Sequence, residues 1–273
     1  MFHYDRLSQQ AQRVYAIGDV HGRFDLFKQL MALIRQDHTR RAAVKTGIIV
    51  LGDIIDRGPD AAKLVHGCMK LSTLSDGFMV LKGNHEEMMV QALNGDLDVY
   101  RAWLNFGGRE TLQSWNVDPI HTTDTPTKAD LKVAAKTVGK EITSWLDDLP
   151  LYYQHGDFLF VHAGIRPLLP MQRQHPSDLL WITDDFLTST IDHGITVIHG
   201  HSISEGGPDI RPNRIGIDTG AYRTNRLTAI GVERGDTWYL DTASTEDVEL
   251  AGCADSSVAA GSDLRRDDRI SLR

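Results

Sequence analysis

Short apolar runs rich in β-branched residues recur along the chain, and most end in glycine and a polar residue. Runs of this length and composition are typical of strands buried in a sheet. The strands predicted in this way cover residues 14–17, 47–51, 78–81, 158–161 and 196–198. Between the first two, apolar residues recur at spacings of three and four, from Leu26 to Ile34, which predicts an amphipathic helix. Asp25 lies near the start of this helix, where a carboxylate interacts favourably with the positive end of the helix dipole. The chain therefore begins with a β-α-β unit.

After residue 86 the pattern becomes helical, around a polar, turn-rich stretch at 116–127. The helices predicted there are Met88–Leu93, Val99–Phe106 and Lys128–Leu149, which make a helical insertion over about 87–150. Three further strand-like runs, at 215–217, 227–230 and 238–240, are spaced as in an antiparallel meander that would complete a second sheet. Residues 243–273 are rich in Ser, Ala, Gly and Asp, and we expect a disordered tail. We predict one α+β domain over residues 1–242.

The composition narrows the class of protein. Hydrophobic residues make up 41% of the chain, enough for a full core, and the net charge of −8 argues against broad binding of nucleic-acid phosphates. Cys68 and Cys253 have no metal-like spacing, and two cysteines cannot form a disulfide framework. The start of the chain lacks a signal-peptide pattern, and no apolar run reaches the length of a membrane span. We expect a cytoplasmic protein with no nucleic-acid or membrane partner.

Polar residues with metal-binding side chains follow each predicted strand. In chain order they are Asp19 and His21, Asp53, Asn84, His162, and His201. Each one alone has an ordinary explanation, as a turn carboxylate, a helix cap or a surface histidine. Because ligands bind beyond the carboxyl ends of strands in open α/β sheets, we expect all five strands to deliver these residues to one sheet edge.

This ligand set exceeds what one tetrahedral ion accepts and fits two adjacent divalent ions that share a carboxylate. Nitrogen and oxygen ligands without thiolate suit Mn²⁺, Fe or Zn²⁺ better than Ca²⁺, and we favour Mn²⁺. Two such ions lower the pKa of a bridging water and bind phosphoryl oxygens, an arrangement that hydrolyses phosphate esters by in-line attack.

An in-line attack needs an acid for the leaving oxygen. His85, beside Asn84, can donate that proton, and Asp56 can orient its imidazole and raise its pKa. Arg57 can bind the free phosphate oxygens. The plain alternative is that Asp56 and Arg57 form a helix cap and a surface ion pair.

These motifs resemble the metal-dependent phosphoprotein phosphatases within the calcineurin-like metallophosphoesterases, closest to the small bacterial and phage members. The resemblance extends from about Arg13 to Leu240 and rests on Gly18-Asp19-Val20-His21-Gly22, Gly52-Asp53-Ile54-Ile55-Asp56-Arg57-Gly58, Gly83-Asn84-His85-Glu86, His162-Ala163-Gly164 and His199-Gly200-His201. Similar stretches run from Trp103 to Thr111, from Leu179 to Trp181 and from Ile217 to Ala221. The resemblance implies a β-sandwich flanked by helices, with metal ions at the strand ends.

The same resemblance implies a role for each site residue. Asp19, His21 and Asp53 would hold the first metal ion, and Asp53, Asn84, His162 and His201 the second. His85 would be the general acid, oriented by Asp56, while Arg57 and Asn84 would contact the substrate phosphate.

One position departs from the family pattern. Bacterial and phage members usually carry a phosphate-binding arginine two residues after the tryptophan of the Leu-Leu-Trp stretch, where this chain has Thr183. Losing such a contact weakens phosphate binding by about 1.5–3 kcal/mol. Arg166 is our candidate replacement, and a solvated loop arginine is the alternative.

The resemblance favours hydrolysis of phosphoserine and phosphothreonine in proteins, with phosphorylated small molecules as further substrates. A symmetrical dinucleoside tetraphosphatase of the same superfamily is the main alternative, although that branch typically has Ala and Asp where this chain has Asp56 and Glu86. A non-catalytic phosphoprotein-binding module, suggested only by Thr183, is the third.

Overall fold

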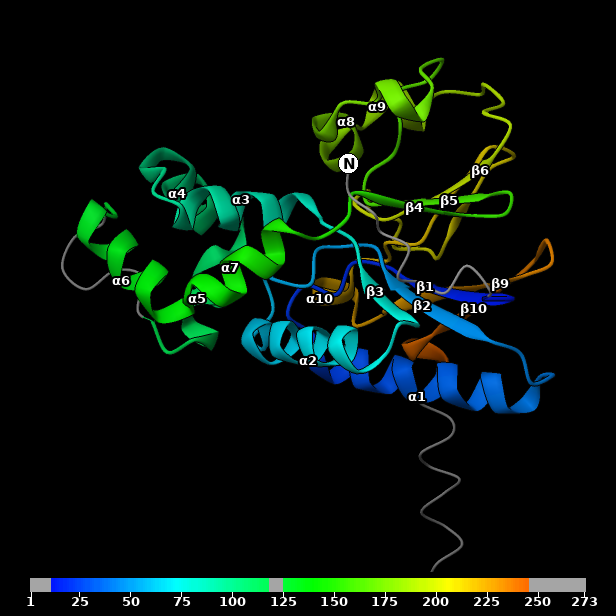
Figure 1. The fold of residues 1–273 in the computed structure, drawn as a ribbon, viewed down its shortest axis with the longest axis horizontal. Helices are drawn as coiled ribbons and strands as arrows, with labels where there is room; N and C mark the ends of the chain where they lie inside the picture. The colour runs from blue at the N-terminus through cyan, green and yellow to red at the C-terminus, as the bar shows by residue number, and fades with distance from the viewer. Residues whose placement is uncertain (1–10, 118–124, 246–273) are drawn as a thin grey trace, which may run out of the picture.

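The structure, a computed structural model, describes residues 11–117 and 125–245 and contains two five-stranded mixed sheets (Figure 1). In spatial order, the first sheet consists of β10 (Asp236–Asp241), β9 (Thr228–Glu233), β1 (Arg13–Ile17), β2 (Thr46–Val50) and β3 (Phe78–Val80). The second consists of β4 (Tyr152–His155), β5 (Phe158–Val161), β6 (Thr196–His199), β8 (Arg214–Gly216) and β7 (Asp209–Ile210). The predicted α+β fold is confirmed.

Successive side chains of β1 point to opposite faces of the first sheet, and each face packs in a separate hydrophobic core. Val14 and Ala16 pack with Phe160 and Ile198 of the second sheet, so these faces form the centre of a sandwich. The side chains that point the other way, such as Tyr15 and Ile17, pack under helices. These helices are α1 (Phe24–Arg40) and α2 (Ala61–Leu74), which cover the outer face of the first sheet (Figure 1).

The segment of the chain between β3 and β4 is mainly helical. Its helices are α3 (Asn84–Leu93), α4 (Leu97–Trp103), the kinked turn η1 (Leu104–Gly108), α5 (Arg109–Ser114), α6 (Lys128–Val138) and α7 (Lys140–Asp147), grouped at one end of the molecule (Figure 1). The shorter helical elements are η2 (Met171–Arg173), α8 (Pro176–Trp181), α9 (Asp184–Leu187), α10 (Ala221–Thr224) and η3 (Thr242–Thr245).

Two element predictions were wrong. The last three strands do not form a meander, because β8 joins the second sheet beside β6 while β9 and β10 form a hairpin on β1 of the first. The helix predicted over Lys128–Leu149 is two helices, since Gly139 between them has φ 87°, outside the helical region.

The prediction that five strands meet at one sheet edge was also wrong. The first three strands belong to one sheet and β5 and β6 to the other, so the polar residues come from two facing sheets. The predicted chain start, most of the polar stretch at 116–127, Cys253 and nearly all of the predicted tail lie outside the described residues. Within residues 11–117 and 125–245, no helix combines the length and apolarity needed to cross a membrane.

Candidate metal and catalytic site

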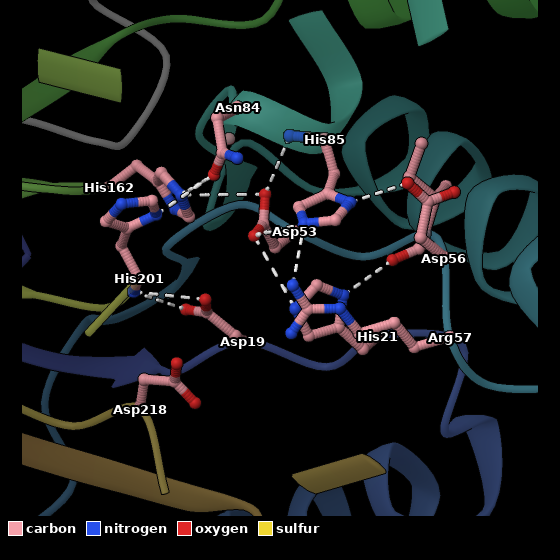
Figure 2. A network of polar contacts seen from close by, with 12 residues as sticks. Asp19, His21, Asp53, Asp56, Arg57, Asn84, His85, His162, His201 and Asp218 are labelled. Atoms are coloured by element: carbon pink, nitrogen blue, oxygen red, sulfur yellow. Dashed lines mark hydrogen bonds and ion pairs between the residues drawn. The ribbon is translucent and has the colours of Figure 1, made fainter. Parts of the chain in front are cut away.

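Asp53, in the loop after β2, lies at the centre of the predicted ligand cluster (Figure 2). Its Oδ2 is 3.6 Å from His21 Nε2 after β1, and its Oδ1 is 3.5 Å from His162 Nε2 after β5. Two groups of side chains close enough to hold a metal ion share this carboxylate. One comprises His21, Asp53 and His85, and the other Asp53, His162 and His201.

The two remaining predicted ligands lie in the same cluster. Asn84 Oδ1 is 2.7 Å from His162 Nε2 and 3.0 Å from His201 Nδ1. The carboxylate of Asp19 accepts a hydrogen bond of 3.0 Å from the backbone N–H of His201, which joins the end of β1 to the loop after β6. The structure therefore brings together all six predicted ligands, four from loops of the first sheet and two from loops of the second (Figure 2).

The histidines offer lone pairs to this cluster. Nδ1 of His21 lies 2.8 Å from the carbonyl oxygen of Ile55, and Nδ1 of His162 lies 2.9 Å from that of Leu51. Because a carbonyl only accepts, each Nδ1 carries the hydrogen and each Nε2 presents a lone pair toward Asp53. Burial lowers the pKa of His21 to about 3 and also lowers that of His162. Neutral imidazoles fixed by a carbonyl and facing a carboxylate are the donor set that divalent metal ions take in proteins.

Several site residues have a strained backbone. A positive φ is uncommon outside glycine and costs on the order of 1 kcal/mol or more. In this site it occurs at His21 (44°), Asp53 (48°), Asp56 (69°), Arg57 (67°) and His201 (62°). The surrounding fold holds these loops in one conformation, and such strain is concentrated at functional sites.

His85 and Asp56 form a buried pair. His85 Nδ1 lies 2.6 Å from Asp56 Oδ2, which leaves Nε2 facing the cluster, 3.8 Å from Asp53 Oδ2. Burial lowers the pKa of His85, but the carboxylates of Asp53 and Asp56 outweigh burial and raise it to about 9. This geometry gives His85 a ring nitrogen that can deliver a proton into the site.

Two residues that the sequence analysis did not assign hold Asp56 in place. Trp103 Nε1 donates to both oxygens of the Asp56 carboxylate, at 3.0 and 2.8 Å, and the Thr111 hydroxyl donates to Oδ1 at 2.6 Å. Thr111 also accepts from the backbone N–H of Asp56. Both lie in the Trp103–Thr111 stretch already noted for its family resemblance, which was the only sequence indication of this role.

Two further carboxylates were not assigned from sequence. Glu86 is fully buried and accepts from the backbone N–H groups of Asp53, Ile54 and Gly83, so it fixes the loop that carries Asp53. Asp218, in the loop after β8, is buried near Asp19, and burial together with the negative charge of Asp53 raises its pKa to about 6. Asp218 lies two residues after β8, in the Ile217–Ala221 stretch that resembles the family.

The two predicted phosphate-binding arginines differ in their surroundings. Arg57 points into the site, with Nη2 3.2 Å from His85 Nε2 and its guanidinium 4.6 Å from the centre of the Tyr222 ring. Arg166 donates to Asp178 and Asp185 in a neighbouring hollow that Thr183 also lines. No hydrogen bond or ion pair within the described part of the chain joins Arg166 to the ligand cluster, and its role as a phosphate binder stays a prediction.

Two facing mixed sheets with a shared-carboxylate cluster at their loops define the architecture of a metallophosphoesterase. The chain belongs to the calcineurin-like phosphoesterase family, whose model matches residues 12–224. This confirms the resemblance inferred from the strand-end motifs.

Curated relatives with similar sequences include symmetrical bis(5'-nucleosyl)-tetraphosphatases. A symmetrical bis(5'-nucleosyl)-tetraphosphatase from Acidovorax sp. (strain JS42) is 31% identical over 158 residues, which is 56% of this chain and 44% of that protein. The chain thus spans less than half the length of the curated relatives it matches.

Solved structures share the fold at low identity. A candidate diadenosine tetraphosphatase has a TM-score of 0.59 at 17% identity, covering 85% of this chain and 94% of that one. A protein serine/threonine phosphatase from Saccharomyces cerevisiae has a TM-score of 0.57 at 16% identity, covering 87% and 81%. Similarity at this level establishes the fold and leaves the substrate open.

Proposed function

We propose that this protein is a metal-dependent phosphomonoesterase that hydrolyses phosphoserine and phosphothreonine in proteins. The observation that carries the proposal is the buried His85–Asp56 pair at 2.6 Å. An alkoxide from serine is a poor leaving group and needs a proton, whereas the phosphate leaving group of an anhydride departs readily without one. A chain that buries a carboxylate to orient a histidine is therefore suited to ester cleavage.

The proposed ligands build on the two groups that share Asp53, with Asp19 added to the first, Asn84 added to the second, and His85 kept as the acid. Asp19, His21 and Asp53 would hold one divalent ion, and Asp53, Asn84, His162 and His201 the other. Manganese is the favoured metal, with iron or zinc as alternatives, because the donors are nitrogen and oxygen. Two such ions would supply Lewis-acid stabilisation of the phosphoryl oxygens and a water of lowered pKa.

Side chains of the protein would bind the phosphate and transfer the proton. Arg57 and the Asn84 amide bind the phosphate oxygens and hold the phosphorus in line for attack by water. As the bond between phosphorus and the serine oxygen breaks, His85 Nε2 gives its proton to that oxygen, and Asp56 stabilises the imidazolium before transfer. Tyr222 packs against Arg57 and limits the directions in which the guanidinium can turn.

The proposal is tested with two substrates of different leaving-group quality. With Mn²⁺, we expect the wild type to cleave p-nitrophenyl phosphate and a phosphoserine peptide. Substituting His85→Asn should lower kcat on the peptide by about 10²–10⁴-fold and much less on p-nitrophenyl phosphate, whose leaving group needs no acid. Equal losses on both substrates would contradict a general-acid role and favour His85 as a metal ligand, which its place in one of the two ligand groups allows.

A symmetrical dinucleoside tetraphosphatase is the second candidate, because the curated relatives carry that name. Diadenosine tetraphosphate in the same assay separates the two. Hydrolysis of the dinucleotide with no turnover of phosphopeptide would replace the first proposal by the second.

A further inference from the structure

A hollow of about 600 Å³ lies against Arg57, beside the site. Its walls come from η1, the start of α5 and α10, and include Arg57, Asn105, Phe106, Arg109, Glu110 and Tyr222. The predicted metal ligands do not line it. Arg57 and Tyr222 both line the hollow, and the Tyr222 ring centre lies 4.6 Å from the Arg57 guanidinium and 5.3 Å from the centre of the His21 ring, so the hollow adjoins the site at Arg57. The part of the substrate attached to a phosphate held by Arg57 can therefore enter the hollow.

The turn η1 fixes this wall to the catalytic loop. The carbonyl of Gly107 accepts a hydrogen bond from the backbone N–H of Arg57, at 3.3 Å, and Gly107 has φ 112°. Two residues further along, Arg109 begins α5, and Thr111 of the same helix binds Asp56. The backbone on both sides of Arg109 is thus anchored to the loop that carries Asp56 and Arg57.

The charged residues that line the hollow are two arginines, Arg57 and Arg109, and one carboxylate, Glu110. Within residues 11–117 and 125–245, neither Arg57 nor Arg109 forms an ion pair with a carboxylate, although the chain as a whole has a net charge of −8. Phe106 at the rim is 54% exposed. An exposed aromatic ring beside an unpaired guanidinium suits a group that is anionic and partly apolar.

We infer that Arg109 binds a second anionic group of the substrate, close to the phosphate that is cleaved. The inference rests on the proposed phosphoesterase function and adds a specificity determinant to it. In a phosphopeptide the group is an acidic side chain next to the phosphoserine. In a dinucleoside polyphosphate it is the neighbouring phosphate.

The test compares two peptides that differ only by Asp or Asn after the phosphoserine, with Mn²⁺ present. We expect the wild type to favour the Asp peptide about fivefold in kcat/KM, the size of one partly exposed ion pair. Arg109→Ala should remove this preference and Arg109→Glu should reverse it. Arg35→Ala, which removes an equal charge from the exposed side of α1, should keep it.

The outcomes separate this inference from the proposed function. Cleavage of both peptides with the same ratio in wild type and Arg109→Ala overturns the inference and leaves the function standing. Cleavage of diadenosine tetraphosphate without any peptide turnover overturns the proposed function. In that case a KM for the dinucleotide raised about fivefold in Arg109→Ala, but not in Arg35→Ala, supports the inference, and an unchanged KM overturns it.

Discussion

The carboxylate of Asp56 is fully buried, and its position depends on donors that lie far from it in sequence. A buried charge is tolerated only when it is paired and hydrogen-bonded. Trp103, Thr111 and His85 together provide these contacts. Trp103 and Thr111 therefore hold in place the carboxylate that orients His85. Loss of either donor should impair His85 as the proposed acid.

Trp103→Phe tests this coupling, because it keeps most of the ring and removes the N–H. We expect unfolding free energy to fall by about 1–3 kcal/mol, as one donor to a buried carboxylate is lost. We also expect kcat on the phosphoserine peptide to fall several-fold more than kcat on p-nitrophenyl phosphate. A purely structural role would lower both rates alike. Trp115→Phe, half-buried elsewhere in the helical region, is the control and should keep the ratio of the two rates.

At the scale of elements, the turn η1 joins the helical region to the catalytic loop. A Cβ on Gly107 would lie 2.6 Å from the backbone nitrogen of Arg57, a contact that real side chains do not make. Gly95, between α3 and α4, has a similar φ of 118° but open space around its Cβ position. Alanine substitutions at these two glycines therefore distinguish the effect of backbone strain from the effect of the contact with Arg57.

We expect Gly95→Ala to lower the free energy of unfolding by about 1–2 kcal/mol through strain alone and to leave KM unchanged. Gly107→Ala should lower it further and raise KM for p-nitrophenyl phosphate, since the Arg57 backbone must move. Urea unfolding and steady-state kinetics measure both effects. Equal behaviour of the two variants would show that η1 does not position Arg57.

The elements also show what could be read from the sequence. Strand-end residues such as Asp53 and His162 were predicted because a polar side chain directly after a β-branched run is a local pattern. Sheet membership was not, because the pairing of β8 with β6 and of β9 with β1 depends on contacts between distant segments. Strand β4 alternates exposed and half-buried residues and has no apolar run to reveal it.

The same limit applies to the site. The six predicted ligands come together, because the fold needs only to bring strand ends to one place. Trp103, Thr111 and Tyr222 escaped assignment because their roles are contacts with Asp56 and Arg57 across the tertiary structure. Residue type alone does not predict that an interior tryptophan or a helical threonine will hold a catalytic carboxylate in place.

At the scale of the whole molecule, the site lies where loops from the ends of the two sheets meet, and several buried carboxylates gather there. Asp19, Asp53 and Asp218 are all buried there. The pKa of Asp19 is raised well above its usual value, mainly by burial and also by repulsion from Asp218 and Asp53. Cations bound at this point would offset the repulsion. They would also tie the first sheet, through Asp53, to the second, through His162 and His201.

Adding Mn²⁺ to chelator-treated protein should therefore stabilise the folded state. An ion at 100 times its dissociation constant contributes about 2.7 kcal/mol, which corresponds to a rise in Tm of roughly 5–10 °C for a domain of this size. Asp53→Asn should lose most of this rise, because both ligand groups share Asp53. Asp157→Asn, exposed in the turn between β4 and β5, should keep it. Thermal unfolding followed with increasing Mn²⁺ measures the effect, and an equal rise in wild type and Asp53→Asn would place the bound ion elsewhere.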